Sequence, residues 1–170
     1  EELAVANAVP TVEGAVQIAM EELPITIHNA RTLVIGYGRL GRLLAHRLSS
    51  LGAKVSVSAR KWADLAWAEA YGYGVEQTDL LEGWLCPYDL IVNTVPARVL
   101  TAPVLAALRP GSLIVDLASK PGGTDFDAAR RLGHKVIHAL SLPAVCAPET
   151  AGEAVAHTVL TILREREERA

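Results

Sequence analysis

The sequence has little cysteine, no block of basic charge and no long apolar run. Its two cysteines, Cys86 and Cys146, lie apart, with no C-x-x-C pair and no Cys/His cluster, which argues against a disulfide framework and against a metal site. The net charge of -3 without a basic block argues against a nucleic-acid surface. Because no apolar run reaches the ~18 residues of a membrane span, we expect neither a membrane segment nor a signal peptide. From the absence of these features we expect a cytoplasmic protein.

The composition is that of one globular domain with its own core: of 170 residues, 51% are hydrophobic and 21% charged. From residue 31 onward, strand-like and helix-like segments alternate, which predicts an α/β fold with a doubly wound parallel sheet in three layers. The runs 90–92 and 113–115 are continuously apolar, as in strands covered on both faces. Strands are expected at 32–36, 54–58, 74–76, 89–93, 112–117 and 135–139, and helices at 39–51, 62–71, 79–84, 101–107, 125–132 and 149–166.

An apolar helix precedes the first strand, beginning at Pro10 and ending at Pro24. Two-domain dehydrogenases carry such a hinge helix between a substrate domain and a nucleotide domain. We therefore divide the chain into a hinge helix over 1–28, a dinucleotide-binding domain over 29–148, and a C-terminal helix over 149–170 that packs back on the hinge region. The apolar faces of the two terminal helices could also pack on a second copy, so a homodimer is one expectation.

The most informative stretch is the turn after the first strand, where Gly36, Gly38 and Gly41 have the G-x-G-x-x-G spacing. Gly36 permits the tight turn, Gly38 lets a pyrophosphate approach the backbone, and Gly41 lets the next helix pack closely on the strand. The N-terminus of that helix favours an anion. The pattern predicts a Rossmann-like dinucleotide site; a glycine-rich turn without a nucleotide is the alternative. The other residues of the turn expected at this site are Tyr37, Arg39 and Leu40.

The end of the second strand bears on the type of dinucleotide. An NAD site places Asp or Glu there, ~20 residues after the glycine turn, but this chain reads Ser58-Ala59-Arg60-Lys61. A carboxylate would repel a 2′-phosphate, whereas Arg60 can pair with one, Lys61 adds charge and Ser58 donates a hydrogen bond. The sequence therefore favours NADP over NAD; the alternative is that Arg60 and Lys61 only solvate a surface loop.

The loop after the strand at 89–93 should form part of the other side of the cleft, because ligands of open parallel sheets lie at the carboxyl ends of the strands. It reads Asn93-Thr94-Val95-Pro96. We expect it to flank the nicotinamide ribose, with Asn93 and the local backbone supplying hydrogen bonds. The alternative is a polar strand end that a proline turns.

The loop after the strand at 112–117 combines a cation, a Pro-Gly-Gly run and two acids. Lys120 is the cation placed to meet an acidic substrate, and Gly122 and Gly123 could offer backbone N–H groups to it. Ala118 and Ser119, just before them, are expected beside the cofactor. A solvated loop lysine is the alternative interpretation of Lys120.

No nucleophile or acid–base histidine stands out in the sequence. Cys146 lies in a two-proline loop over 142–152 with no base beside it, so we interpret it as a packed small residue. The five histidines are dispersed, and none is assigned a catalytic role. His138, on the last strand, is interpreted as a buried and hydrogen-bonded residue.

Several of these stretches together resemble the family of the dipicolinate synthase A chain. The string over 116–126, Asp-Leu-Ala-Ser-Lys-Pro-Gly-Gly-Thr-Asp-Phe, is far more specific than the glycine turn. The likeness spans essentially the whole chain, although Ser141, Ala144 and Glu149 depart from the closing pattern of that family. The other matching stretches are 10–15, 36–41, 58–60, 93–96 and 142–152.

The resemblance implies NADP-linked oxidation of a dihydrodipicolinate ring to pyridine-2,6-dicarboxylate during sporulation, in the mother-cell cytoplasm, together with the second, flavoprotein-like chain of dipicolinate synthase. It gives Lys120 the role of pairing with a carboxylate of this small dicarboxylate substrate, and places Thr11 and Glu13 of the hinge on the substrate side. Glu13 is a candidate proton acceptor or, equally, an acid favoured by the helix dipole. The family also has an N-terminal domain of roughly a hundred residues, so this chain resembles the nucleotide-binding domain alone.

Two other classes of protein remain open. A dehydrogenase of the shikimate, methylenetetrahydrofolate or 2-hydroxyacid type would share the hinge and the cofactor. The first two should lack the Ser-Lys-Pro-Gly-Gly loop, and the 2-hydroxyacid enzymes carry a histidine that 141–152 does not contain. A non-catalytic NAD(P)-sensing module would bind the dinucleotide without a role for Lys120.

Overall fold

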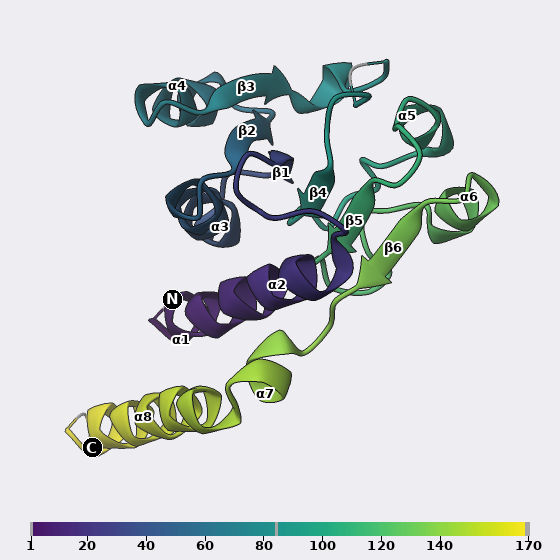
Figure 1. Ribbon diagram of the computed structural model, residues 1–170. Helices are drawn as coiled ribbons and strands as arrows, with labels where there is room; N and C mark the ends of the chain where they lie inside the picture. The colour runs from purple at the N-terminus through teal and green to yellow at the C-terminus, as the bar shows by residue number, and fades with distance from the viewer. Residues whose placement is uncertain (1, 84, 169–170) are drawn as a thin grey trace.

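The centre of the molecule is one sheet of six parallel strands in the order β3-β2-β1-β4-β5-β6 (Figure 1). The computed structural model describes residues 2–83 and 85–168. Because the winding reverses between β1 and β4, a crevice opens at the carboxyl ends of these strands. The Rossmann-like fold class predicted from the sequence is confirmed. The strands are β1 Arg31–Ile35, β2 Lys54–Ala59, β3 Gly74–Gln77, β4 Leu90–Asn93, β5 Leu113–Asp116 and β6 Lys135–His138.

Alternate residues of each central strand pack into two separate cores, one on each face of the sheet. Val34 of β1 lies in the core under α2, α3 and α4, whereas its neighbours Leu33 and Ile35 lie in the core under α5 and α6. The sheet is therefore the middle of three layers, as predicted. The helices of the outer layers are α2 Ala8–Glu22, α3 Arg39–Ser50, α4 Trp62–Ala70, α5 Ala102–Ala106 and α6 Phe126–Arg131.

The N-terminal helix is longer than predicted. α2 begins at Ala8 rather than Pro10, because a proline is tolerated in the first turn of a helix, and a short helix, α1 Glu2–Ala6, precedes it. α2 ends at Glu22, just before Pro24, as expected. The helical run Glu2–Glu22, with a mean hydropathy of 1.3, has the length and composition of a membrane span, contrary to the expectation that no apolar run is that long. Length and composition do not distinguish a span from a core helix, and 33% of the apolar window is buried in the molecule.

Residues 142–148, predicted as a loop, contain a further helix, α7 Leu142–Cys146. It follows Ser141, whose φ of 57° is left-handed, and it packs on α2 at Gly14. A Cβ at Gly14 would lie 3.1 Å from Cys146 Sγ and 3.2 Å from Leu142, so a larger residue here would make α7 give way by a few tenths of an ångström. The Cys146 thiol donates a hydrogen bond to the carbonyl of Pro10 (3.0 Å).

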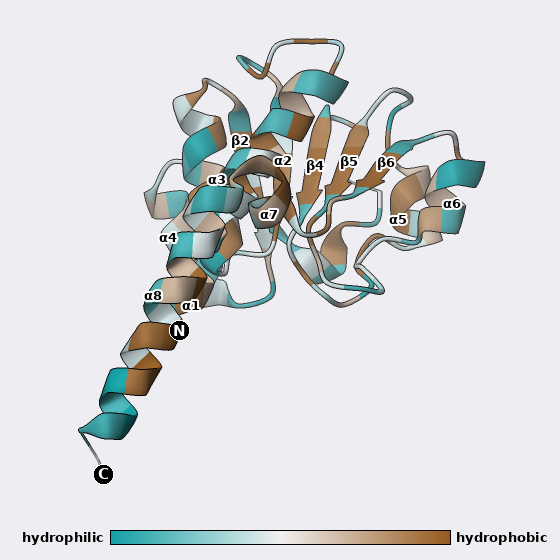
Figure 2. Ribbon diagram, turned by 90° about the horizontal axis from the view of Figure 1, so that it is seen from below, coloured by the Kyte–Doolittle hydropathy of each residue, from teal (hydrophilic) through white to brown (hydrophobic). Residues whose placement is uncertain are grey.

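The C-terminal helix, α8 Pro148–Glu167, leaves the body of the molecule (Figure 2). None of its described residues is buried, and it contacts α1 and α7. Its apolar side is about half exposed at Val155, Val159 and Ile162. The helix expected at 79–84 is a 3-10 turn, η1 Thr78–Leu80, and position 84 falls outside the described residues.

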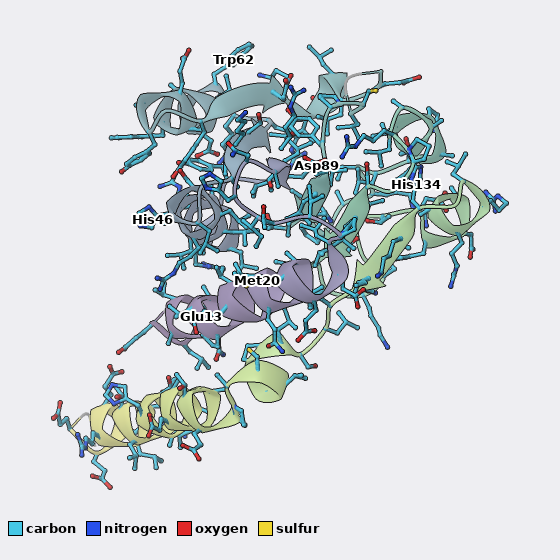
Figure 3. The ribbon with its side chains drawn as sticks, viewed as in Figure 1. Glu13, Met20, His46, Trp62, Asp89 and His134 are labelled. Atoms are coloured by element: carbon cyan, nitrogen blue, oxygen red, sulfur yellow. The ribbon has the colours of Figure 1, made fainter. Side chains whose placement is uncertain are left out.

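Polar side chains fix the amino-terminal edge of the sheet, opposite the crevice. Asp89 accepts a hydrogen bond from the backbone N–H of Arg31 (2.7 Å) and forms an ion pair with Arg109. His134 Nε2 is 2.9 Å from the carbonyl of Leu105, which ties β6 to α5 (Figure 3). These contacts hold the strand starts and neighbouring helices together at the edge opposite the crevice.

Substitution of Gly41 by alanine is expected to destabilise the fold. An added Cβ would lie 2.0 Å from the Gly36 carbonyl oxygen, so α3 would have to move off the strand, at about 1–3 kcal/mol of unfolding free energy. Urea denaturation measures this loss. The matched control is Gly38→Ala, where a Cβ meets nothing within 4 Å and the change should cost only the weaker N-cap preference of alanine, less than about 1 kcal/mol. Equal losses at the two positions would contradict the close packing of α3.

Candidate functional site

One groove of about 540 Å³ lies at the carboxyl edge of the sheet, where the winding reverses. It brings together the glycine turn after β1, the end of β2 and the loop after β4. These are three of the stretches that the sequence placed at the cofactor. The lining residues are 36–40, 59–61 and 94–96, together with Asp64 and Thr78.

The three glycines of the turn have three different surroundings. Gly36 has a φ of +96°, and a Cβ on it would lie 2.4 Å from the hydroxyl of Thr94, which itself donates to the Ile35 carbonyl (2.8 Å). Gly41 lies against the Gly36 carbonyl. Gly38 faces open space and is the N-cap of α3 without any side-chain cap. The first turn of α3 thus presents uncapped backbone N–H groups beside an open position, which is the arrangement that binds a pyrophosphate.

The end of β2 supplies the basic side of the groove. Arg60 and Lys61 are exposed and line it beside Ala59. Ser58 differs from the prediction: its side chain is fully buried and its hydroxyl lies 2.7 Å from that of Thr78. Ser58 therefore does not line the groove, and Thr78 does. Thr78 comes from η1, twenty positions later in the chain, and no pattern in the sequence pointed to it.

A second polar group missed by the sequence analysis is Asp64, in the first turn of α4. Its carboxylate lies 3.1 Å from the guanidinium of Arg42. Arg42 Nε also donates to the carbonyl of Tyr37 (3.1 Å), and the guanidinium lies 5.1 Å from the centre of the Tyr37 ring. Arg42 thus ties the glycine turn to α4. Burial raises the pKa of Tyr37, and the nearby phenol of Tyr73 adds to this rise, so the hydroxyl stays protonated at neutral pH.

The carboxylate of Asp116, at the end of β5, holds the loops on the other side of the crevice. It is completely buried and accepts four hydrogen bonds. Oδ1 accepts from the Asn93 amide and from the Ala118 N–H, both at 3.0 Å. Oδ2 accepts from the Gly123 N–H (2.9 Å) and from the hydroxyl of Thr124 (2.6 Å). One side chain thereby orients the loop after β4 and the loop after β5.

Asn93 therefore has a different role from the one expected. Its amide donates to the Val95 carbonyl and to Asp116, and its Oδ1 accepts from the Val95 N–H (3.1 Å). The side chain is completely buried and shapes the wall formed by Thr94, Val95 and Pro96 instead of facing the groove.

In the loop after β5, the backbone N–H groups of Gly122 and Gly123, which were expected to meet a substrate, donate hydrogen bonds within the protein instead. The Gly122 N–H donates to the carbonyl of Ser119 (2.8 Å) and the Gly123 N–H to Asp116. Ala118 is buried, and its carbonyl lies 2.8 Å from His138 Nε2, so His138 is half-buried and hydrogen-bonded. Lys120 and Ser119 are exposed. Both side chains are therefore accessible to a ligand, although residues 118–120 do not line the groove itself.

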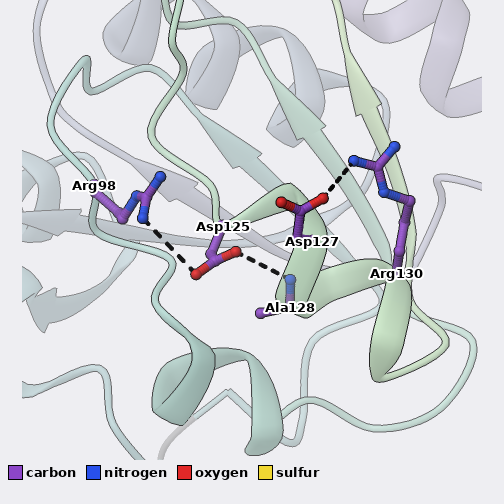
Figure 4. Close-up of polar contacts among 5 residues, drawn as sticks. All are labelled: Arg98, Asp125, Asp127, Ala128 and Arg130. Atoms are coloured by element: carbon purple, nitrogen blue, oxygen red, sulfur yellow. Dashed lines mark hydrogen bonds and ion pairs between the residues drawn. The ribbon is translucent and has the colours of Figure 1, made fainter.

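The same loop is fastened to the loop after β4. The backbone N–H groups of Val99 and Leu100 both donate to the Gly123 carbonyl at 3.0 Å. Asp125 caps α6 by accepting from the Ala128 N–H (3.0 Å), and its other oxygen lies 3.9 Å from Arg98 (Figure 4). The two loops therefore behave as one unit on the β4–β5 side of the crevice.

The two hinge residues assigned to the substrate side lie elsewhere. The hydroxyl of Thr11 donates to the Asn7 carbonyl (2.6 Å). The exposed Glu13 carboxylate lies 3.8 Å from Arg47, in the last turn of α3 and therefore away from the glycine turn that begins this helix (Figure 3). Neither placement brings these residues to the carboxyl edge of the sheet.

Metal binding has no structural support in the described ranges. Within 2–83 and 85–168, no three His, Cys, Asp or Glu side chains are grouped as a metal ion would require. Cys86 is exposed and Cys146 half-buried, both as free thiols.

Comparison with known proteins identifies the family and the fold. The family described as alanine dehydrogenase/PNT, C-terminal domain, matches residues 3–165. The chain belongs to this family. It is 39% identical over 165 residues to the A chain of dipicolinate synthase from Bacillus subtilis (strain 168), a match that covers 97% of this chain and 56% of the relative. It is 28% identical over 140 residues to alanine dehydrogenase of Halomonas elongata, covering 76% of this chain and 37% of that protein.

Solved structures agree with this assignment to the alanine dehydrogenase/PNT C-terminal domain family. The dipicolinate synthase A chain of Bacillus halodurans matches with a TM-score of 0.93 at 39% identity, over 95% of this chain and 55% of that one. The A chain from Bacillus subtilis matches with a TM-score of 0.96 at 38% identity, over 99% of this chain and 57% of that one. The transhydrogenase from Sinorhizobium meliloti shares the fold. It matches with a TM-score of 0.84 at 21% identity, over 96% of this chain and 55% of that one. The resemblance inferred from 116–126 is confirmed, and the chain spans little more than half the length of these relatives.

Replacing Asp116 by alanine is expected to lower the free energy of unfolding by about 3–5 kcal/mol. The change leaves several buried N–H and O–H groups without an acceptor, and each such group costs about 1–3 kcal/mol. Urea denaturation measures the loss. The matched control is Asp127→Ala, which removes an exposed carboxylate that pairs with Arg130 and should cost less than about 0.5 kcal/mol. Similar losses in the two variants would contradict the role given to Asp116.

Proposed function

We propose that this chain is the NADP-binding domain of an oxidoreductase of the dipicolinate synthase A-chain type, which oxidises dihydrodipicolinate to pyridine-2,6-dicarboxylate. The observation that carries the proposal is the groove in which an open glycine, Gly38, and the uncapped start of α3 lie beside Arg60 and Lys61. This combination fits a pyrophosphate next to a phosphorylated ribose. The similarity to the dipicolinate synthase A chain over 97% of this chain supports the choice of substrate.

In this proposal the groove holds an extended dinucleotide. Gly36, Gly38 and the first turn of α3 bind the pyrophosphate, and Arg60 and Lys61 pair with the 2′-phosphate. The wall of Thr94, Val95 and Pro96 places the nicotinamide toward the β4–β5 side of the crevice. When bound, the nicotinamide accepts a hydride from a ring carbon of the substrate, which also loses a proton and becomes aromatic.

Lys120 meets the substrate in this arrangement. The substrate is a dianion, and the exposed ammonium of Lys120, in the loop after β5, can pair with one of its carboxylates. Asp116 does not touch the substrate; it positions the loop that carries Lys120 and, through Asn93, the wall beside the nicotinamide. Because Gly122 and Gly123 use their N–H groups within the loop, they keep its shape rather than bind the substrate.

This chain spans 56% of its relative in Bacillus subtilis, and the proposal includes a substrate domain that completes the cleft. We infer a hinge helix over 1–28, a nucleotide domain over 29–148 and a returning helix over 149–170; the contacts of α8 with α1 and of α7 with α2 support this division. A second, different chain of the enzyme follows from the name of the relative, and a homodimer through α8 is a further proposal. The setting would be the cytoplasm of a sporulating cell.

One observation favours NAD as a second candidate cofactor. Asp64 lines the groove, and a carboxylate there could accept hydrogen bonds from ribose hydroxyls. We prefer NADP because Arg42 already neutralises this carboxylate, whereas Arg60 and Lys61 are exposed in the same groove.

The double variant Arg60→Ala/Lys61→Ala tests the choice of cofactor. We expect NADP affinity to fall about tenfold or more, since a charge-assisted hydrogen bond contributes about 1.5–3 kcal/mol, while NAD affinity changes less than about threefold. Isothermal titration calorimetry measures both. Arg130→Ala is the control, because it removes an exposed cation remote from the groove. Equal losses for NADP and NAD would overturn the 2′-phosphate assignment.

Lys120→Ala, made in the complete enzyme, tests the substrate assignment. We expect kcat/KM for the dicarboxylate substrate to fall about 10–100-fold, because one carboxylate loses its partner, while NADP affinity is unchanged. Lys120→Arg should restore part of the activity. Lys135→Ala, which removes an exposed lysine on β6 that pairs with Glu22, is the control. Full activity of Lys120→Ala would exclude this role.

A further inference from the structure

A second groove, of about 470 Å³, lies between α3 and α4 on the outer side of the glycine turn. It gathers three of the four tyrosines of the chain and one of its three tryptophans. These aromatic residues are Tyr37, Tyr71, Tyr73 and Trp67, and the polar residues beside them are Arg42 and His46. The chemistry proposed above gives no role to Trp67, Tyr71, Tyr73 or His46.

The aromatic side chains stack on one another in a row at the surface of the molecule. The rings of Trp67 and Tyr71 are 6.2 Å apart at an angle of 29°, and those of Tyr71 and Tyr73 are 6.3 Å apart at 27°. The Trp67 residue is 57% exposed and Tyr71 66% exposed. Large aromatic surfaces left in water in this way are a mark of binding sites, and near-parallel rings suit a flat ligand that stacks on them.

The polar groups of the groove are mainly hydrogen-bond donors. Burial raises the pKa of Tyr37 and of Tyr73, so these phenols keep their protons at neutral pH. The guanidinium of Arg42 has five N–H groups, of which one donates to Tyr37 and one lies against Asp64. His46 is exposed on α3 (Figure 3). Donors beside open rings fit an anionic oxygen on a planar molecule.

We propose that this groove is a binding site for a planar aromatic carboxylate. The ring stacks on Trp67 and Tyr71, and the carboxylate accepts hydrogen bonds from Arg42, His46 and the phenols. The volume, the aromatic lining and the few converging polar groups match small-molecule sites, whereas a protein partner would need a broader, flatter surface. The natural ligand we infer is pyridine-2,6-dicarboxylate, and this identification, unlike the chemical class, rests on the proposed function.

The position of the groove couples it to the cofactor site. Tyr37 lines both grooves, and Arg42 binds both Tyr37 and Asp64, which line the cofactor groove. A carboxylate that engages Arg42 weakens its pair with Asp64 and leaves that acid facing the cofactor phosphates. The ligand should therefore lower the affinity for the dinucleotide, and by linkage the dinucleotide should lower the affinity for the ligand.

Calorimetric titration of the chain with pyridine-2,6-dicarboxylate tests the site. We expect Trp67→Ala and Tyr71→Ala each to weaken binding about three- to tenfold, the size of one stacking contact. Trp62→Ala is the matched control, because Trp62 is an exposed tryptophan of the same helix that does not line the groove. Glutarate, with two carboxylates but no ring, should bind about tenfold more weakly. NADP at saturation should weaken binding of the aromatic diacid about two- to fivefold.

Several results would overturn the proposal. One is the absence of any heat of binding at up to about 10 mM pyridine-2,6-dicarboxylate. Another is an equal loss of affinity in the Trp62 and Trp67 variants. A loss of affinity in Lys120→Ala would place the ligand at the substrate loop instead. If Trp67→Ala abolished association with another protein chain but left binding of the diacid intact, the groove would belong to a protein partner. Failure of NADP to bind, with binding at this groove intact, would overturn the proposed function alone.

Discussion

One buried carboxylate holds the ligand side of this molecule together. Asp116 ends β5 without access to water and accepts four hydrogen bonds from residues of two different loops. A charge in that position is tolerated only because all its acceptor capacity is used. The loops after β4 and β5 therefore cannot shift independently. The shape of the wall beside the cofactor and the position of Lys120 both depend on this single contact set.

Local patterns were enough to predict the fold and the geometry of the glycine turn. The apolar runs of β4 and β5 indicated strands covered on both faces, and the spacing of Gly36, Gly38 and Gly41 indicated a turn whose three glycines do have three different surroundings. Such features depend on neighbours within one strand–turn–helix unit. They can be inferred from the sequence because the physical constraint acts over a few residues.

The roles that the sequence analysis missed depend on contacts between distant segments. Ser58 and Asn93 lie at the ends of their strands, and the pattern does not say whether such a side chain faces the groove or the interior. Ser58 faces the interior because its hydroxyl hydrogen-bonds with that of Thr78, and Asn93 does so because its amide donates to Asp116. The helix α7 was missed for the same reason, because a short segment containing Pro143 is held in helical form by packing on α2 rather than by its own propensity.

The packing of α7 on α2 links the two ends of the chain. Gly14, in the N-terminal helix, is a place where α7 touches α2, and a Cβ on Gly14 would lie only 3.1 Å from Cys146 Sγ. Since α8 continues from α7, a residue near the start of the chain sets the direction in which the last helix points. A partner that packs on α8 would therefore have its orientation relative to the cofactor groove set by the close contact of α7 with Gly14.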